Sequence, residues 1–228
     1  MSDLADISLR QAALIAGLGY VVIFVFGYGN VRREKLNVRG DPAATASNII
    51  ASESRFRVGI SSWIVVLVAD VVVAWALYIF LRPVSDELSL LTAWVRLIYV
   101  AVAAIAVVNL LSVSDVLTGD ADTEGLRADL RIAQSRRLLS SYDFGFNVAF
   151  VFFGLHILGL GYLIVRSESI PTVLGILLLI ASVGYLIDSF ACVLSSSYGN
   201  NEAHKLVFAV PAIIAELSLT VWLLIWGG

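Results

Sequence analysis

Residues 58–81, VGISSWIVVLVADVVVAWALYIFL, decide the fold of this chain. The run is long enough to cross the hydrocarbon core of a bilayer as a helix, which takes about 20 consecutive apolar residues. It is continuous rather than alternating, so it does not fit a strand of a membrane β-barrel. Asp70 lies near its middle, where no water is available to solvate a charge. The run therefore predicts a membrane-spanning helix with a polar group inside it.

Five further runs of this kind predict an all-α, polytopic membrane protein with six transmembrane helices in one bundle. Besides 58–81, the predicted spans are 9–28, 89–113, 143–165, 171–195 and 206–226. Pro83 and Pro171 separate neighbouring spans, because proline ends a helix or occupies its first turn. No cleavage pattern follows the first run, which favours a retained helix over a signal peptide. We expect residues 1–228 to form a single transmembrane helical domain.

The composition agrees with a protein whose solvent is largely lipid. The 228 residues are 59% hydrophobic and 14% charged, with a mean hydropathy of +0.90. Soluble domains have about 45–50% apolar and about 25% charged residues. The net charge of −3 argues against a nucleic-acid partner. The single cysteine, Cys192, excludes an internal disulfide and any metal cluster built from several cysteines.

Two long connections, residues 29–57 and 114–142, hold most of the basic residues outside the spans. Asp41-Pro42 predicts a helix start, so residues 43–56 are expected to form a surface helix that runs into the second span. Residues 114–142 are expected to form a solvated connector helix, with Leu126, Leu130 and Ala133 at helical spacing. The alternative for both long connections is a basic amphipathic helix on the lipid surface. The excess of Lys and Arg in alternate connections predicts a plasma-membrane protein with both termini outside and both long connections in the cytoplasm.

Five of the six spans carry one ionisable residue well inside the run. These candidate ligand-binding or proton-relay residues are Asp70, Arg96, His156, Asp188 and Glu216. A charge at the centre of a spanning helix costs about 2.5–3.5 kcal/mol on insertion scales, so such groups are expected to face the protein interior. Small residues share a helix face with some of them, as Ala212 does with Glu216. Such faces predict contacts between helices, since small residues let helices approach closely.

Three functions remain open for this polar set. The first is a buried site that binds or conducts a small ligand, namely a proton, a cation or a polar head group. The second is a membrane-embedded enzyme that acts on a lipid or isoprenoid, with His156 and the carboxylates in an acid–base or metal site. The third is a structural or partner-binding subunit in which Arg96 merely pairs with a carboxylate. The sequence favours a non-enzymatic role and leaves the substrate, the oligomeric state and the catalytic residues open.

No cofactor is predicted, and the metal signal is weak. His156, Asp70, Asp188 and Glu216 are weak metal candidates, because one histidine and three carboxylates lack a metal-binding spacing such as H-E-x-x-H. A retinal protein needs a lysine at mid-membrane, and neither Lys35 nor Lys205 is there. The sequence has no P-loop, dinucleotide-binding glycine pattern or nucleophile elbow. The expected partners are the lipid bilayer and a small molecule or ion.

A family signal covers nearly the whole chain and is most specific in its second half. The stretches concerned are 70–78, 81–83, 93–99, 152–156, 161–162, 171, 174–175 and 184–189. With these stretches the chain resembles the bacterial and archaeal membrane proteins grouped as domain-of-unknown-function family 4386. The resemblance implies a multi-helix membrane protein and supplies no activity. It includes the candidates Asp70, Arg96, His156 and Asp188.

Overall fold

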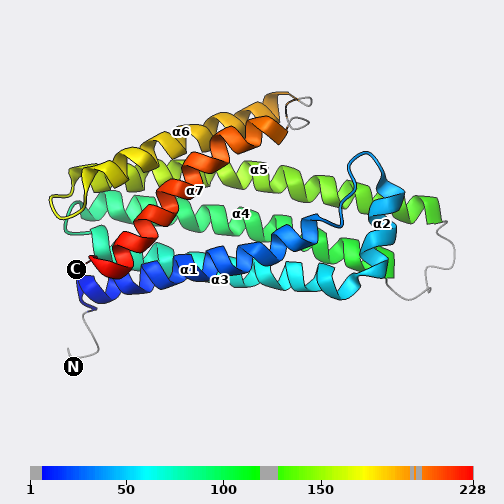
Figure 1. The fold of residues 1–228 in the computed structure, drawn as a ribbon, viewed down its shortest axis with the longest axis horizontal. Coiled ribbons are helices and arrows are strands. Elements are labelled where there is room, and N and C mark those ends of the chain that lie inside the picture. Colours follow the sequence, from blue (N-terminus) through cyan, green and yellow to red (C-terminus); the bar gives the residue numbers. More distant parts are fainter. Residues whose placement is uncertain (1–6, 119–127, 196–197, 199–201, 228) are drawn as a thin grey trace. The chain divides into compact units, whose positions relative to one another are not determined.

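A computed structural model of the chain describes residues 7–118, 128–195, 198 and 202–227, without the side chains of residues 28–34 and 202–209. Within these ranges the chain forms seven helices and no strand, which confirms the all-α class (Figure 1). In chain order they are α1 (Leu9–Glu34), α2 (Pro42–Ala51), α3 (Glu53–Leu81), α4 (Asp86–Thr118), α5 (Ala128–Arg166), α6 (Thr172–Leu194) and α7 (Glu202–Ile225).

Each predicted span falls in a helix of its own. The described stretches Leu9–Gly27, Glu53–Leu81, Asp86–Thr118, Ala128–Arg166 and Thr172–Leu194 are long and apolar enough to cross a membrane. In α7 the described apolar stretch, Val210–Ile225, is shorter. Five candidate spans indicate a multi-pass membrane protein, while the sixth crossing and the orientation of the termini stay predictions.

The predicted start of the short helix α2 is confirmed. The Asp41 side chain caps it by accepting a hydrogen bond from the Ala44 N–H at 2.8 Å, and Pro42 occupies the first helical turn. The expectation that this helix runs on into the second span is wrong. The helix ends at Ala51, where the Ser52 N–H bonds to the carbonyls of Asn48 and Ile49, and α3 then starts anew at Glu53.

The second long connection also differs from the expectation. Residues 114–118 continue α4, and residues 128–142 are the first part of the 39-residue helix α5 rather than a separate connector. Leu126, part of the predicted spacing, lies outside the described residues. The Arg131 side chain closes the end of α4 by donating to the carbonyls of Val116 and Leu117 at 2.8 and 3.2 Å. A last-turn carbonyl needs such a donor because it has no partner within its own helix.

The chain divides into two compact units. Unit 1 comprises Met1–Val21, Ala69–Ala101 and Asn147–Gly228, and unit 2 comprises Val22–Val68 and Val102–Phe146. The helices α1, α3, α4 and α5 thus contribute one segment to each unit. The single bundle expected from the sequence stays a prediction.

Unit 1 is built by close helix contacts. The helices α6 and α7 pack along each other, and α5 meets α6 at Gly161 and Gly175. A Cβ atom added at Gly161 would lie 2.9 Å from the Gly175 carbonyl oxygen. The end of α7 lies beside the start of α1 (Figure 1), where the Arg10 guanidinium donates to the Leu224 carbonyl at 3.0 Å. Unit 1 therefore brings the first and last helices of the chain together.

In unit 2, α2 is held against the segment that precedes it. The Val38 N–H donates to the Thr45 hydroxyl oxygen at 2.9 Å, and this hydroxyl lies 3.0 Å from the Asp41 carbonyl oxygen. The rings of Trp63 in α3 and Phe146 in α5 are 4.4 Å apart, centroid to centroid. These contacts order unit 2 without any of the five candidate residues.

Candidate functional site

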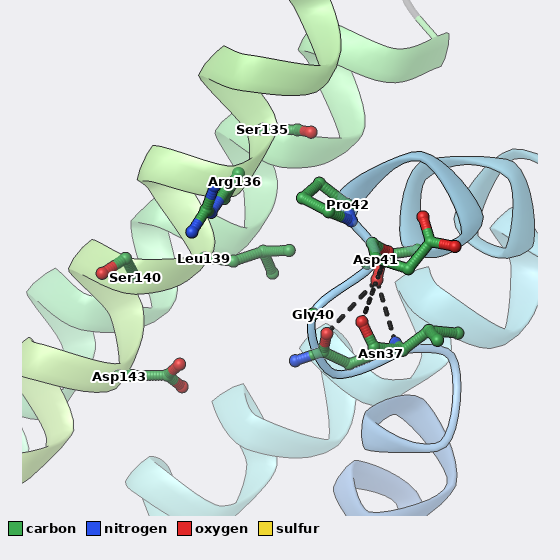
Figure 2. Close-up of a pocket in the computed structure, with 11 residues that line it drawn as sticks. Asn37, Gly40, Asp41, Pro42, Ser135, Arg136, Leu139, Ser140 and Asp143 are labelled. Atoms are coloured by element: carbon green, nitrogen blue, oxygen red, sulfur yellow. Dashed lines mark hydrogen bonds between the residues drawn. The ribbon is translucent and has the colours of Figure 1, made fainter. Parts of the chain in front are cut away.

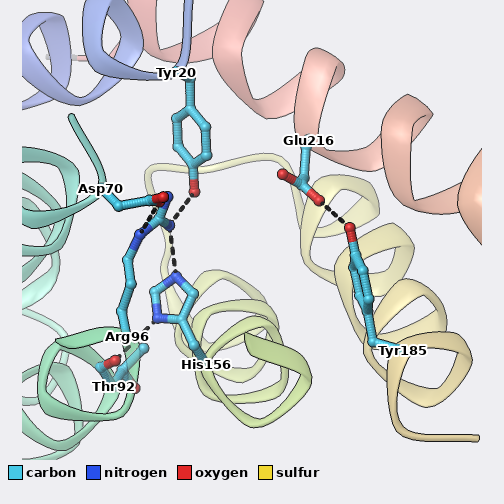
Figure 3. Close-up of polar contacts among 7 residues, drawn as sticks. All are labelled: Tyr20, Asp70, Thr92, Arg96, His156, Tyr185 and Glu216. Atoms are coloured by element: carbon cyan, nitrogen blue, oxygen red, sulfur yellow. Dashed lines mark hydrogen bonds and ion pairs between the residues drawn. The ribbon is translucent and has the colours of Figure 1, made fainter. Parts of the chain in front are cut away.

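Arg96 in α4 is the centre of a polar network inside unit 1 (Figure 3). The side chain is 1% exposed. Its Nε–H donates to Oδ1 of Asp70 at 3.0 Å, and one Nη2–H donates to the same oxygen. The Nη1 group donates to the Tyr20 hydroxyl at 3.0 Å and lies 2.9 Å from Nε2 of His156. The Arg96 cluster (Arg96, Asp70, Tyr20 and His156) therefore joins α4 to α3, α1 and α5.

The partners of His156 define its protonation. A guanidinium can only donate, so Nε2 of His156 accepts from Arg96. The other ring nitrogen, Nδ1, lies 2.9 Å from the Thr92 carbonyl oxygen, which can only accept. The ring is therefore neutral, with its proton on Nδ1. Both nitrogens are occupied, so in this state the histidine is not free to act as a general base or a metal ligand.

Aromatic rings surround the guanidinium. The Arg96 Cζ atom lies 5.1 Å from the centre of the Tyr20 ring and 5.6 Å from the centre of the Phe153 ring. A cation over an aromatic face is attracted by the ring quadrupole. Phe153 also meets Tyr185 of α6 in an edge-on contact at 5.1 Å. One ring therefore lies between the Arg96 cluster and the next polar group.

That group is the Glu216 pair, formed by Glu216 of α7 and Tyr185 of α6 (Figure 3). The Tyr185 hydroxyl donates to Oε1 of Glu216 at 2.9 Å. Glu216 is close enough to Arg96 and Asp70 for its charge to interact with theirs, yet it shares no hydrogen bond with either. Its Oε2 atom accepts no hydrogen bond from the described residues. Among the described residues, Glu216 is thus a buried acid without a cationic hydrogen-bond partner.

Asp188 does not join the network. It lies one turn beyond Tyr185 in α6, is only partly buried and hydrogen-bonds the Tyr198 side chain. Its Oδ1 atom is buried and has no hydrogen-bond partner among the described residues. The structure thus brings together Asp70, Arg96 and His156, places Glu216 nearby and leaves Asp188 apart. The described residues contain no group of three or more His, Cys, Asp or Glu side chains able to hold a metal ion.

Sequence reasoning missed the neutral partners Tyr20, Thr92 and Tyr185 as site residues. A hydroxyl or a main-chain carbonyl within an apolar run costs far less than a charge, so it does not stand out. The signal available was the need of each buried charge for partners. Tyr20 and Tyr185 are among the tyrosines of the same apolar runs, so they were available as such partners.

A separate polar cavity of about 180 Å³ lies in unit 2 (Figure 2). One wall is the segment from Asn37 to Thr45, and the other is the face of α5 that carries Arg136, Ser140 and Asp143. None of the five candidate residues lines it. The cavity therefore belongs to the packing of α2 on α5 rather than to the candidate site.

The contact between α4 and α5 that holds His156 depends on Gly159. A Cβ atom there would lie 2.5 Å from the Thr92 hydroxyl oxygen, so Gly159→Ala is expected to push the helices apart. We expect a loss of about 1–3 kcal/mol in the free energy of unfolding, the usual cost of overpacking. The ¹⁵N chemical shift of His156 Nδ1 is expected to report a weakened bond to the Thr92 carbonyl.

A second substitution separates this steric effect from a general loss of stability. Thr92→Ala removes the hydroxyl and keeps the carbonyl that His156 uses. The double variant with Gly159→Ala and Thr92→Ala is therefore expected to regain both the stability and the histidine shift. Failure of this rescue would contradict the close-approach role of Gly159.

Similarity to known proteins covers nearly the whole chain. The sequence model of a family described as "Domain of unknown function (DUF4386)" matches residues 15–227, a range that includes the Arg96 cluster and the Glu216 pair. An uncharacterized protein of Archaeoglobus fulgidus is 33% identical to the chain over 123 residues. The match covers 54% of this chain and 60% of that protein, less than two thirds of its length. No solved structure gives a significant match.

Proposed function

The chain belongs to the DUF4386 family, and we propose that it is a multi-pass membrane protein that binds and releases a proton at Glu216. The proposal rests on one observation, namely that buried acidic side chains outnumber buried basic ones among the described residues. Asp70 and Glu216 are both buried, and Arg96 is the one buried arginine or lysine among the described residues. A buried charge is tolerated when it is paired, and otherwise it is neutralised. Because Arg96 is bonded to Asp70, Glu216 is the group left to be neutralised.

A proton suits this acid better than a metal ion. Cations such as Ca²⁺ take about six to eight oxygen ligands. Around Glu216, Oε1 is already occupied by Tyr185, and the described residues offer no cluster of further carboxylates or histidines. A proton needs only one oxygen. The free Oε2 atom supplies it.

The partner of Glu216 fits both protonation states. A tyrosine hydroxyl rotates, so it donates to a carboxylate and can accept from a carboxylic acid. Tyr185 therefore keeps its contact with Glu216 when the proton arrives or leaves. Glu216 is also more exposed than the other charged groups, at 8% against 2% for Asp70 and 1% for Arg96. These features favour Glu216 as the exchanging group and the Arg96 cluster as a fixed centre.

The closed Arg96 cluster supports a structural role for its own members. Four of the five guanidinium N–H groups have protein acceptors, and His156 has no free nitrogen. An enzyme that used His156 as a general base would first have to break one of these bonds. The geometry therefore favours proton binding over catalysis by a membrane-embedded enzyme.

Infrared spectroscopy of the purified full chain tests the proposal directly. A protonated buried carboxylic acid gives a carbonyl-stretching band that is absent from a carboxylate. We expect such a band to appear as the pH is lowered and to be lost in Glu216→Gln. Tyr185→Phe is expected to keep the band and shift its frequency, because the carboxyl loses its hydrogen-bond partner.

The matched control is Glu87→Gln, which neutralises an exposed carboxylate in the first turn of α4. This variant should leave the band unchanged. In liposomes with a pH-sensitive dye inside, Glu216→Gln should also abolish any proton uptake that the wild-type chain shows. A band that survives in Glu216→Gln would show that Glu216 is not the proton-binding group.

A further inference from the structure

Two adjoining cavities of unit 1 form one groove at the end of α7. Both are lined by Pro171, Trp222 and Trp226, and their volumes are about 470 and 740 Å³. One runs between the first turn of α6 and the last turns of α7, and the other lies over the turn that joins α5 to α6. We call this the tryptophan groove. It contains no residue of the Arg96 cluster or the Glu216 pair.

The two halves of the tryptophan groove differ in polarity. The α6–α7 half is lined chiefly by aliphatic side chains, among them Leu174, Leu217 and Val221. The half over the α5–α6 turn is lined by Ser167, Glu168, Ser169 and Thr172. A ligand that fits both halves has an apolar chain and a polar head, which is the chemistry of a membrane lipid.

The polar half is also lined by one charged residue and two aromatic rings. Glu168 is the one acidic or basic residue among those that line the groove. Trp222 is held by the ring of Phe80, 6.2 Å away between centroids, and Trp226 is 62% exposed. Tryptophan faces and a carboxylate together attract an organic cation, and tryptophan is the best of the aromatic residues for this contact.

The position of the tryptophan groove at the helix ends agrees with binding of a lipid head group. The groove lies where α5 ends, α6 begins and α7 ends. Tryptophans at the ends of membrane-spanning helices favour the level of the lipid head groups. The charged head of a lipid would therefore meet Glu168 and the two indole rings without leaving its normal depth.

We propose that the tryptophan groove binds one lipid molecule whose head group carries an amine or a quaternary ammonium. The cationic part of the head lies against Trp222 and Trp226 and next to Glu168. One acyl chain follows the aliphatic half between α6 and α7. The site does not include Glu216, so a failure of lipid binding would not count against proton binding at Glu216.

Native mass spectrometry of the full chain in detergent tests this site with short-chain lipids as probes. Phosphatidylcholine and phosphatidylglycerol with identical acyl chains differ in the charge of the head. We expect the choline lipid to bind about tenfold more tightly, a factor within the range of a cation–π contact together with a charge contact. Glu168→Gln should bring the two affinities close to parity, and Trp226→Leu should weaken choline binding about fivefold.

Both substituted residues are exposed, so the variants are expected to fold. Trp94→Leu is the matched control, because Trp94 is an equally exposed tryptophan that does not line the groove. It should leave the preference unchanged. Equal affinity of the wild-type chain for both lipids, or a choline preference that survives in Glu168→Gln, would overturn the proposal. So would the same loss in Trp94→Leu.

Discussion

Replacing Arg96 with methionine is expected to lower the free energy of unfolding by about 3–5 kcal/mol, the cost of breaking a buried ion pair from one side. Asp70 would keep its buried carboxylate without a cation. The Tyr20 hydroxyl and Nε2 of His156 would each lose a donor. The measurement is unfolding of the full chain in mixed micelles with increasing dodecyl sulfate, followed by circular dichroism. Arg82→Met, at an exposed arginine beyond α3, should change stability by less than about 0.5 kcal/mol.

A double-mutant cycle then isolates the ion pair. Asp70→Leu leaves the Arg96 charge uncompensated and should cost a similar amount. The variant with both Asp70→Leu and Arg96→Met buries no unpaired charge, and apolar replacements of buried ion pairs are often well tolerated. It is expected to be more stable than the sum of the two single losses implies, by about 2 kcal/mol or more. Additive losses would show that the two side chains do not depend on each other.

Gly175→Ala is expected to have a large effect for a single added methyl group. The new Cβ atom would lie 2.8 Å from the Gly161 carbonyl oxygen and 2.9 Å from the Val165 backbone nitrogen. Backbone atoms cannot rotate away, so α5 and α6 must separate. We expect a loss of about 1–3 kcal/mol in the free energy of unfolding, or more if the packing cannot relax. The same dodecyl sulfate titration measures it.

Gly27→Ala is the matched control for this change. Its Cβ atom would meet nothing within 4 Å, and alanine is a better helix former than glycine by about 0.5–1 kcal/mol. This variant should therefore be as stable as the wild-type chain or more so. An equal loss in both variants would mean that the close approach of α5 and α6 does not decide the result.

The sequence alone was sufficient to predict the class of fold and the family. Long apolar runs located the five candidate spans of the described residues, because lipid requires about 20 apolar residues in a row. They did not locate the helix ends. The helix α5 begins at Ala128, well before its apolar part, since polar residues such as Arg and Gln form helices as readily as leucine does. Hydropathy therefore marks the part of a helix that tolerates lipid, whereas hydrogen bonding decides where the helix stops.

The candidate site was predictable in kind but not in detail. The expense of buried charges indicated that Asp70, Arg96 and His156 face inward, and the structure brings them together. The partner of Arg96 was not predictable, since Asp70, Asp188 and Glu216 were all possible partners. Asp188 and Tyr185 lie on nearby faces of α6, yet only Tyr185 meets Glu216. The choice depends on how α6 and α7 are rotated against each other, which three-dimensional packing decides.

The contact between the start of α1 and the end of α7 can form only after α7 has been synthesised. Arg10 reaches carbonyls more than 200 positions later in the chain, and Gly17 packs against Leu224. During synthesis α1 must therefore wait for α7 before it finds this partner. Translation that stops before α7 would leave α1 without this contact, and such truncated chains should be preferred substrates of membrane quality-control proteases.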